Sequence, residues 1–295
     1  MADLPIFSPP SRVVSLVPST TESLFVLGFG NSVVGITDYC SEPAEQVKGI
    51  QRVGGPKTLR IDDIIRLFPD LIIANQEENS KPILEELIHK QYPVWLTFPK
   101  TISQSLNDLL RLAGVYQSPW AVSQIQHLLR LIDPFEAALL NLKPLTYFCP
   151  IWQSQTPDGI DWWMTFNQDT YPHDVFRLFG GHNVFAHRKR KYPLEADLGL
   201  RDAEPIGDRD DRYPCVSVQE ILDADPEIIF LPTEPYLYQE FMKKMIVEKF
   251  SDTKAVRTGR IYIIDGKWIT WHGVHIIHAI KNLPGYFESG EGLEI

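Results

Sequence analysis

The sequence lacks the features that mark a membrane-spanning, metal-binding or nucleic-acid-binding protein. None of its 295 residues lies in an apolar run of about eighteen, so no transmembrane helix is predicted. Its three cysteines (Cys40, Cys149 and Cys215) are odd in number and far apart, which suits neither a zinc motif nor a disulfide framework. The net charge is −10, and the one basic cluster, residues 187–191, is short and lies in a polar stretch. We therefore expect no nucleic-acid partner.

The first residues also lack the basic and apolar regions of a secretory signal peptide. For the sequence as written we expect a cytoplasmic protein. A periplasmic or cell-surface location is expected instead if the N-terminus has been shortened.

Catalytic motifs are missing as well. The chain contains no GxSxG, HExxH, Walker A or GxGxxG pattern. Its paired acids are adjacent in sequence, and neighbours on a helix or strand do not converge on one substrate. We predict that the protein is not an enzyme.

What the chain does contain is an internal repeat. Residues 62–73 recur in nearly the same residue classes as residues 219–230, at an offset of 220 − 63 = 157 residues. Each copy predicts a short helix with an acidic start, a proline, an acidic residue and a buried strand. Two similar lobes imply a cleft between them, and clefts at domain interfaces are common ligand sites.

Strands alternate with helices on both sides of the repeat, which predicts an α/β fold of two pseudo-symmetric lobes with mostly parallel sheets. Apolar residues at helical spacing between Pro119 and Lys143 predict a long helix, which Pro134 either kinks or divides. We assign residues 1–117 to the N-terminal lobe, 118–143 to an inter-lobe helix and 144–295 to the C-terminal lobe. Further predictions are a helix start with capping hydroxyls at residues 19–22, one strand at 145–152, a helix at 169–179, a turn at 180–181, an exposed loop at 188–212 and a helix at 236–249.

Aromatic residues gather where the predicted strands end. They are Tyr39, Trp152, Trp162, Trp163, Tyr213, Trp268 and Trp271. Ligands of parallel sheets bind beyond the carboxyl ends of the strands, so the set favours a cleft for a flat, apolar ligand. The alternative for each aromatic is that it fills a core. Polar neighbours of Trp162 and Trp163 make the burial of both unexpected.

Two further groups of residues have a functional and a structural interpretation. His272, His275 and His278 could bind a metal, but with no carboxylate nearby in sequence they are more typical of solvated or capping histidines. We expect no metal site, and we expect His272 to contact the ligand. Asp62, Asp63 and Glu220 could present carboxylates to a basic partner, or could simply stabilise helix N-termini.

The order of several motifs resembles a known family, the substrate-binding proteins of ABC importers. These motifs are residues 12–22 (RVVSLVPSTTE), 34–39 (VGITDY), 53–55 (VGG), 69–73 (PDLII), 180–184 (GGHNV) and the second copy of the repeat. The resemblance is to the branch with a rigid inter-lobe helix, which takes vitamin B12, haem and iron–siderophore complexes. Within it, the chain is most similar to the B12-binding members.

The resemblance implies reversible binding of a metal chelate, a corrinoid such as cobalamin, between the lobes of a monomer, with no covalently held cofactor. It implies a cleft lined by Tyr39, Trp163, Met164, Tyr213 and Trp271, with His272 beside it. It also implies docking of Asp62, Asp63 and Glu220 onto arginines of a permease dimer. The chain departs from the B12-binding members in carrying Pro56 in place of a Trp and Gln219 in place of a Glu. The alternatives are a haem or iron–siderophore binding protein, and a cytoplasmic chelate carrier or sensor without a permease.

Overall fold

The computed structural model describes residues 8–287, which divide into two compact units. The first comprises residues 8–133 and 271–277, and the second comprises residues 134–270 and 278–287. Each unit is built around a parallel sheet, which confirms the predicted α/β class.

The sheet of the first unit has the strand order β3-β2-β1-β6-β7, and its strands run parallel. The strands are β1 (Val13–Ser15), β2 (Val33–Ile36), β3 (Gln51–Arg52), β6 (Leu71–Asn75) and β7 (Val94–Thr97). All five residues of β6 are buried, as expected for a central strand covered on both faces.

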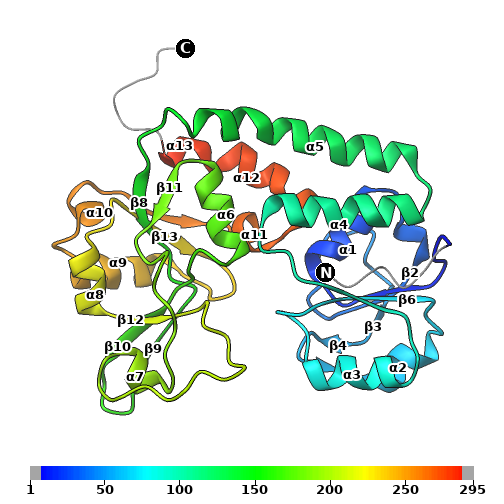
Figure 1. Cartoon of the computed structure of the whole chain (residues 1–295), viewed down its shortest axis with the longest axis horizontal. Helices are drawn as coiled ribbons and strands as arrows, with labels where there is room; N and C mark the ends of the chain where they lie inside the picture. The colour runs from blue at the N-terminus through cyan, green and yellow to red at the C-terminus, as the bar shows by residue number, and fades with distance from the viewer. Residues whose placement is uncertain (1–7, 288–295) are drawn as a thin grey trace. The chain divides into compact units, whose positions relative to one another are not determined.

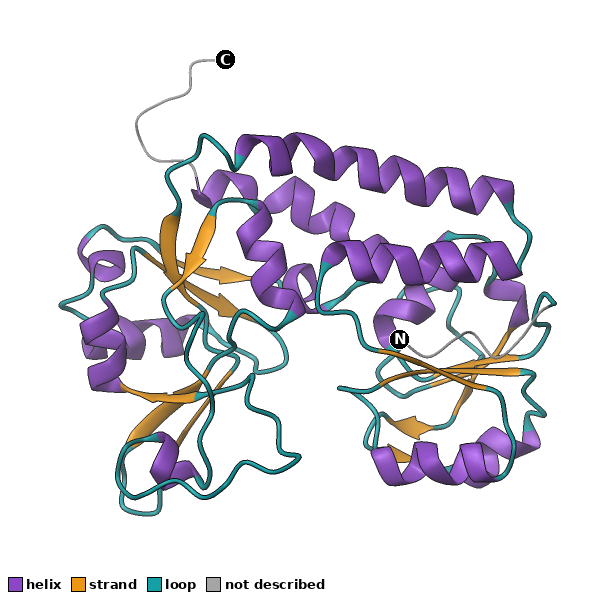
Figure 2. Cartoon of the chain, in the orientation of Figure 1, coloured by secondary structure: helices purple, strands orange, loops and turns teal. Residues whose placement is uncertain are grey.

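Helices cover both faces of this sheet. They are α1 (Pro18–Val26), α2 (Ile61–Arg66), α3 (Lys81–His89) and α4 (Ile102–Val115). In the first unit, α1 and α4 lie on one side of the sheet and α2 and α3 on the other (Figures 1 and 2). A short hairpin, β4 (Gly54–Gly55) and β5 (Thr58–Leu59), follows β3.

The hydroxyls predicted to cap the first helix have another role. Helix α1 begins at Pro18 with Val17 as its N-cap, and no side chain caps it. Instead, the Thr21 hydroxyl donates to the carbonyl oxygen of Val17 at 2.9 Å. Proline at the first position accounts for the early start, because it has no N–H that would need a partner.

A long helix, α5 (Pro119–Ala138), follows α4 and contains Pro134 without interruption. After it, the second unit forms a sheet of order β11-β8-β13-β14, again parallel. Its strands are β8 (Leu145–Phe148), β11 (Gly181–Asn183), β13 (Ile228–Pro232) and β14 (Ile261–Ile264). The predicted turn at residues 180–181 is therefore wrong at Gly181, which begins β11.

The two sheets explain the repeat. In the first sheet, β2 lies on one side of β1 and β6 on the other, with β3 beyond β2 and β7 beyond β6. In the second sheet, β11 lies on one side of β8 and β13 on the other. The repeated segment forms α2 and β6 in one unit and α8 (Val218–Ala224) and β13 in the other. Both copies therefore supply the strand that pairs with the first strand of their sheet.

The second unit also has a three-stranded antiparallel sheet, β12-β10-β9, that the sequence did not predict. Its strands are β9 (Trp152–Gln155), β10 (Asp161–Met164) and β12 (Cys215–Ser217). The single strand expected at 145–152 is wrong, because the chain leaves β8 after Phe148 and enters a separate strand at Trp152. Pro157, Asp158 and Gly159 form the turn between β9 and β10, as their residue types favour.

The remaining helices of the second unit are short. They are α6 (Tyr171–Leu178), α7 (Leu194–Asp197), α9 (Glu240–Lys249), α10 (Lys254–Arg257), α11 (Lys267–Thr270) and α13 (Pro284–Phe287), while α12 (Ile276–Asn282) begins in the first unit. Helices α6 and α9 begin later than predicted. Helix α7 lies inside the predicted loop 188–212.

The segment 271–277 belongs to the first unit although it follows most of the second. Its 3-10 turn η2 (Gly273–His275) packs against α1 and α4. The backbone N–H of Val274 donates to Ser23 Oγ at 3.3 Å. Gly273 has φ +84°, and a Cβ there would lie 2.5 Å from Ser23 Oγ, so both the conformation and the space require glycine.

The acidic residue of each repeat copy binds the beginning of the first strand of its sheet. The Asp70 carboxylate accepts hydrogen bonds from the backbone N–H groups of Ser11 at 2.7 Å and Arg12 at 2.8 Å. The Glu227 carboxylate accepts from the backbone N–H of Thr146 at 2.9 Å and from its hydroxyl at 3.1 Å. Partial burial raises the pKa of both carboxyl groups, but these hydrogen bonds lower the pKa by more than burial raises it. The net shift of each pKa is therefore downward.

We predict that Asp70→Asn and Glu227→Gln each lower the free energy of unfolding at neutral pH by about 1–2 kcal/mol, discounted for partial exposure. Because each pKa is lower in the folded state, the stabilisation is present above the ordinary pKa and is lost as the pH falls through the folded value. Urea unfolding at pH 7 and at pH 3 should show a smaller difference between variant and parent at pH 3. Glu248→Gln, an exposed helical acid, is the matched control, and an equal effect from this variant would contradict the interpretation.

Candidate functional site

In the first unit, the aromatic at the sheet's carboxyl edge is Tyr39, which follows β2 and is 68% exposed. Its ring lies against the β4–β5 hairpin, since a Cβ built on Gly55 would be 3.4 Å from Tyr39 Cε2. The adjoining loop is held by the Arg52 guanidinium, which donates to the carbonyl oxygens of Thr37 at 2.7 Å and Cys40 at 2.8 Å. An aromatic face is thus presented to solvent from a fixed loop.

His272 lies near the end of β6 in the same unit, but it is only 9% exposed. Its Nδ1 is 3.1 Å from Ser19 Oγ, and its Nε2 is 3.4 Å from Asn75 Nδ2 and 3.9 Å from Glu78 Oε1. Burial lowers its pKa to about 4, so the ring is neutral at physiological pH. Contact between His272 and a ligand stays a prediction.

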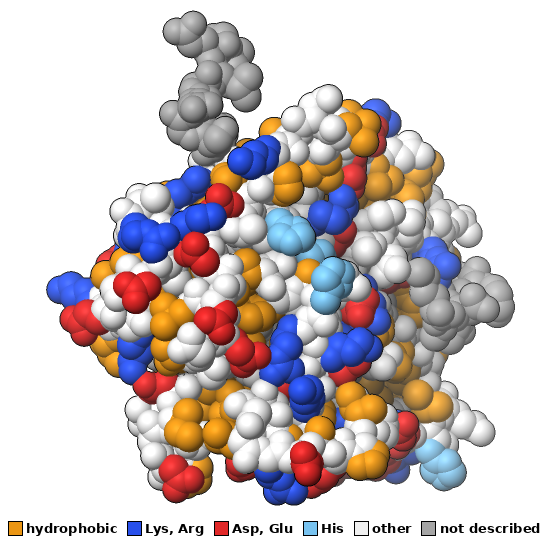
Figure 3. Space-filling view, turned by 60° about the vertical axis from the view of Figure 1, so that its left-hand side comes forward, with side chains coloured by type: hydrophobic (Ala, Val, Ile, Leu, Met, Phe, Trp, Pro, Cys, Tyr) orange, Lys and Arg blue, Asp and Glu red, His pale blue; other side chains and the backbone are white. Residues whose placement is uncertain are grey.

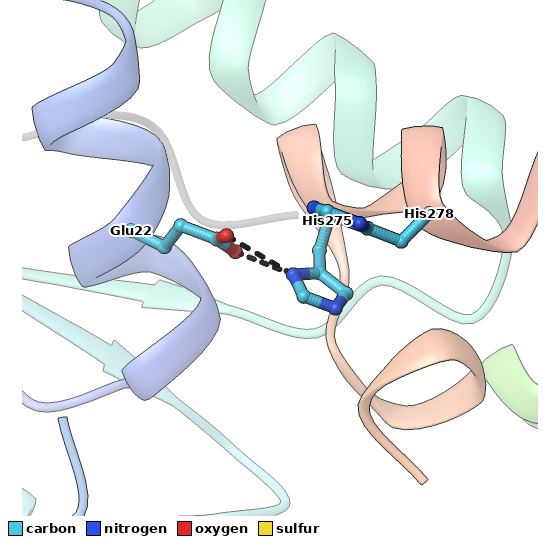
Figure 4. Close-up of side chains that lie close together, drawn as sticks. All are labelled: Glu22, His275 and His278. Carbon is cyan, nitrogen blue, oxygen red and sulfur yellow. Dashed lines mark hydrogen bonds and ion pairs between the residues drawn. The ribbon is translucent and has the colours of Figure 1, made fainter. Parts of the chain in front are cut away.

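Trp271 and His275 are also buried in the first unit. His275 Nδ1 lies 2.8 Å and 3.1 Å from the two carboxylate oxygens of Glu22 on α1, and Figure 4 shows the two side chains facing each other. The Trp271 and His275 rings are 5.3 Å apart, and Trp271 is 7% exposed. A carboxylate distant in sequence therefore binds His275, and His278 follows on the next turn of α12.

In the second unit, the structure brings Met164 and Tyr213 together around a residue that the sequence analysis did not select, Arg190. Arg190 Nη1 donates to the carbonyl oxygen of Tyr213 at 3.2 Å and lies 3.9 Å from Met164 Sδ. Its guanidinium stacks on the Tyr192 ring, with Cζ 4.9 Å from the centroid. In the sequence, Arg190 stands out only as a member of the basic cluster 187–191, a pattern that predicts a polar stretch.

Trp163 lies on the other side of the sheet from its neighbour Met164, because successive residues of a strand face opposite sides. It is 3% exposed and belongs to the core with Phe148 and Phe250. Its indole N–H donates to Gln153 Oε1 at 3.1 Å. Trp162 is also buried, so the expectation that at least one of the pair stays open is wrong.

Trp163 lines a hollow of about 460 Å³ within the second unit. Its other lining residues include Gln153, Asp161, Tyr236 and Met245. A role for Trp163 in ligand binding stays a prediction, and by position it would act from this hollow rather than beside Met164.

The three acids expected to dock a partner differ in their surroundings. Asp62 is exposed and has no hydrogen bond or ion pair to a described residue. Asp63 is bound by Arg60 at 2.6 Å and Arg66 at 3.0 Å. Glu220 forms a capping box with Ser217 and accepts from Arg188 Nε at 3.0 Å. The capping box shows that Glu220 stabilises the N-terminus of its helix. Docking onto a partner stays a prediction for Asp62, Asp63 and Glu220.

On the face shown in Figure 3, acidic and basic side chains are interspersed. Among residues 8–287, no helix is both long and apolar enough to cross a membrane.

Residues 13–267 match the family model described as periplasmic binding protein. The chain belongs to this family. Its members and the relatives below are substrate-binding proteins and not enzymes, which confirms the expectation from the sequence.

Among the relatives of this chain is a vitamin B12-binding protein of Vibrio cholerae serotype O1, 23% identical over 281 residues that cover 95% of this chain and 90% of the relative. A vitamin B12-binding protein of Yersinia pestis is 29% identical over 187 residues, 62% of each chain. The crystal structure of the periplasmic vitamin B12 binding protein BtuF of Vibrio cholerae superposes with a TM-score of 0.73 at 23% identity, covering 94% of this chain and 96% of that one. The haem-binding protein RhuT of Roseiflexus gives 0.69 at 18% identity, with 94% and 97% covered. At these identities the structural likenesses establish the fold.

We predict that Trp163→Ala lowers the free energy of unfolding by about 3–5 kcal/mol, because it leaves a cavity against Phe250. Chemical denaturation measures the loss. Trp120→Ala is the control, since Trp120 is 55% exposed and should change stability by about 0.5 kcal/mol or less. A Trp163→Ala variant as stable as the parent would show that this side chain is not part of the core.

We predict a loss of stability in mild acid that depends on His272. Its folded pKa of about 4 lies below the ordinary 6.5, so its contribution is complete above pH 6.5 and is lost, at about 1.4 kcal/mol per pH unit, as the pH falls toward 4. His272→Gln should flatten the curve of unfolding free energy against pH in that window. His89→Gln, at an exposed histidine, should leave the curve unchanged. Equal slopes in the parent and His272→Gln would contradict the assignment.

Proposed function

We propose that this periplasmic binding protein takes up a corrinoid reversibly and delivers it to an ABC importer. Two kinds of observation support the ligand class: the names of the curated relatives, which are vitamin B12-binding proteins, and the aromatic surface at the carboxyl edge of the first sheet. Delivery requires the protein to work on the side of the membrane from which the permease takes its substrate. Fractionation of cells that express the full gene tests this location.

Tyr39 is the observation that carries the proposal. A large aromatic ring left 68% exposed gains stability only when something covers it, and a flat macrocycle matches its face. The Arg52 hydrogen bonds and the Gly55 contact hold the ring's loop before any ligand arrives. Little ordering is then needed on binding, which favours affinity.

Docking onto the permease forms the second part of the proposal. Asp62 carries an exposed carboxylate in the first unit, and Glu220 a partly exposed one in the second. An arginine of the permease could pair with Asp62 directly, whereas at Glu220 it would compete with Arg188. The two contacts are therefore unequal in strength.

A second candidate ligand is haem, and the Tyr39 hydroxyl favours it. A phenolate oxygen is one of the ligands that proteins offer to haem iron, and Tyr39 is exposed enough to reach it. Some structural neighbours are named as haem-binding proteins. The same titration distinguishes the two, because haem coordinated by phenolate changes its visible spectrum.

We predict that Tyr39→Ala weakens the binding of cyanocobalamin by about tenfold or more, because the corrin loses its aromatic contact. Calorimetry with cyanocobalamin, haem and a ferric siderophore as separate titrants measures the affinities. The melting temperature should hardly change, since the ring is exposed.

Phe68→Ala is the matched control for this variant. Phe68 is 74% exposed in the same unit, but it precedes β6 and so lies at the amino edge of the sheet. Its removal should leave affinity unchanged. Equal losses from both variants, or none from Tyr39→Ala, would place the ligand elsewhere, and a parent protein that binds none of the three titrants would overturn the proposed function.

A further inference from the structure

Arginines in the segment 188–212 of the second unit are almost all neutralised by nearby carboxylates. The pairs are Arg188 with Asp197 and Glu220, Arg201 with Glu204, Arg209 with Glu204 and Arg212 with Asp210. Arg190 differs from these, since it has no carboxylate partner among residues 8–287. Arg52 and Arg260 also have no carboxylate partner among the described residues, but neither has a buried nitrogen without an acceptor, as Arg190 does.

The guanidinium of Arg190 is nevertheless held in place. Nη1 is engaged by the Tyr213 carbonyl oxygen and Met164 Sδ, and the Tyr192 ring supports one face of the plane. Arg209 lies over the same ring, with its Cζ 4.5 Å from the centroid, which fixes Tyr192 in turn. The group is therefore positioned without being neutralised.

The opposite edge of the guanidinium has no acceptor. Nε is buried and makes no hydrogen bond in the described structure, and Nη2 has none there either. Leaving a charged donor buried without an acceptor is costly, so an acceptor supplied by a ligand would be strongly favoured. Nε and Nη2 share one edge, and the side chain as a whole is half-buried, so an acid that reaches Nη2 also meets Nε.

We infer that Arg190 receives an ionised acid of the ligand, a carboxylate or a phosphodiester, through its Nε–Nη2 edge. The inference rests on the proposed function and adds a requirement to it, namely that the chelate carries an anionic group at its periphery. Arginine suits this task because its planar fork matches two acid oxygens. Met164 and Tyr213 then hold the guanidinium from its Nη1 side, and Arg190 determines specificity for the acid.

Matched pairs of ligands with and without the acid test this inference. Cyanocobalamin carries a phosphodiester that dicyanocobinamide lacks, and haem carries carboxylates that are blocked in haem dimethyl ester. The quantity measured by calorimetry is the ratio of affinities within each pair, for the parent and for Arg190→Gln. If Arg190 binds a phosphodiester, Arg190→Gln should change the ratio for the cobalamin pair. If it binds a carboxylate, Arg190→Gln should change the ratio for the haem pair.

We predict that the parent prefers the acid-bearing member of one pair and that Arg190→Gln lowers this preference by about tenfold or more. Arg190→Lys, which keeps the charge and loses the fork, should retain part of it. Lys191→Gln is the control, because it removes an adjacent exposed charge and should leave both ratios unchanged.

The outcomes separate the two proposals. If a chelate binds but neither ratio differs between Arg190→Gln and the parent, the role of Arg190 is overturned and the proposed function stands. If Lys191→Gln lowers the ratio as much as Arg190→Gln does, the effect comes from the loss of any positive charge in this segment, and the inference also fails. If the parent binds neither pair, the proposed function fails and the inference falls with it. Should Arg190→Gln not fold, the comparison of Arg190→Lys with Lys191→Gln decides in the same way.

Discussion

The hydrogen bonds that one carboxylate in each repeat accepts from the beginning of the first strand of its sheet hold together the framework on which the other features depend. Asp70 and Glu227 lie just before β6 and β13. At the beginning of the neighbouring strand, Asp70 accepts from two backbone N–H groups, and Glu227 accepts from one backbone N–H and one hydroxyl. These contacts tie the repeated segment to the beginning of the first strand of its sheet. Because the strands are parallel, their carboxyl ends then gather at one edge, where Tyr39 and His272 are found in the first unit.

The candidate ligand contacts are prepared in different ways in the two units. Tyr39 offers an apolar face whose loop is fixed by hydrogen bonds from the Arg52 guanidinium to backbone carbonyl oxygens. Arg190 offers a charge whose position is fixed by sulfur, carbonyl and aromatic neighbours. The two contacts would select for different properties of a ligand: Tyr39 for a flat apolar face, and Arg190 for an acidic group.

The sequence was informative where local pattern and packing agree. The α/β class and the repeat were predictable, because buried parallel strands are continuous apolar runs and the proline-acid pair marks the same junction twice. The β9–β10 hairpin was not predicted, since its strands are four residues each and β9 is mostly exposed. Without that hairpin, the opposite orientations of Trp163 and Met164 could not be foreseen.

Arg190 was missed for a different reason. Five basic or histidine side chains in a row predict a solvated stretch, and only tertiary structure shows which of them meet carboxylates. Which arginine lacks a carboxylate partner depends on its neighbours in the folded chain, and these cannot be read from the sequence. The burial of His275 against Glu22 was hidden in the same way, because the two residues are 253 positions apart.

That separation has a consequence for how the molecule is made in the cell. The first unit is encoded mainly by the first 133 residues, yet the turn that packs on α1 and α4 is translated only at residues 273–275. During synthesis, the N-terminal sheet can form while Glu22, Ser19 and Ser23 still lack their C-terminal partners. A chain that ends before residue 271 would therefore leave the surface of α1 and α4 that η2 covers open to solvent, with these three polar side chains lacking their partners.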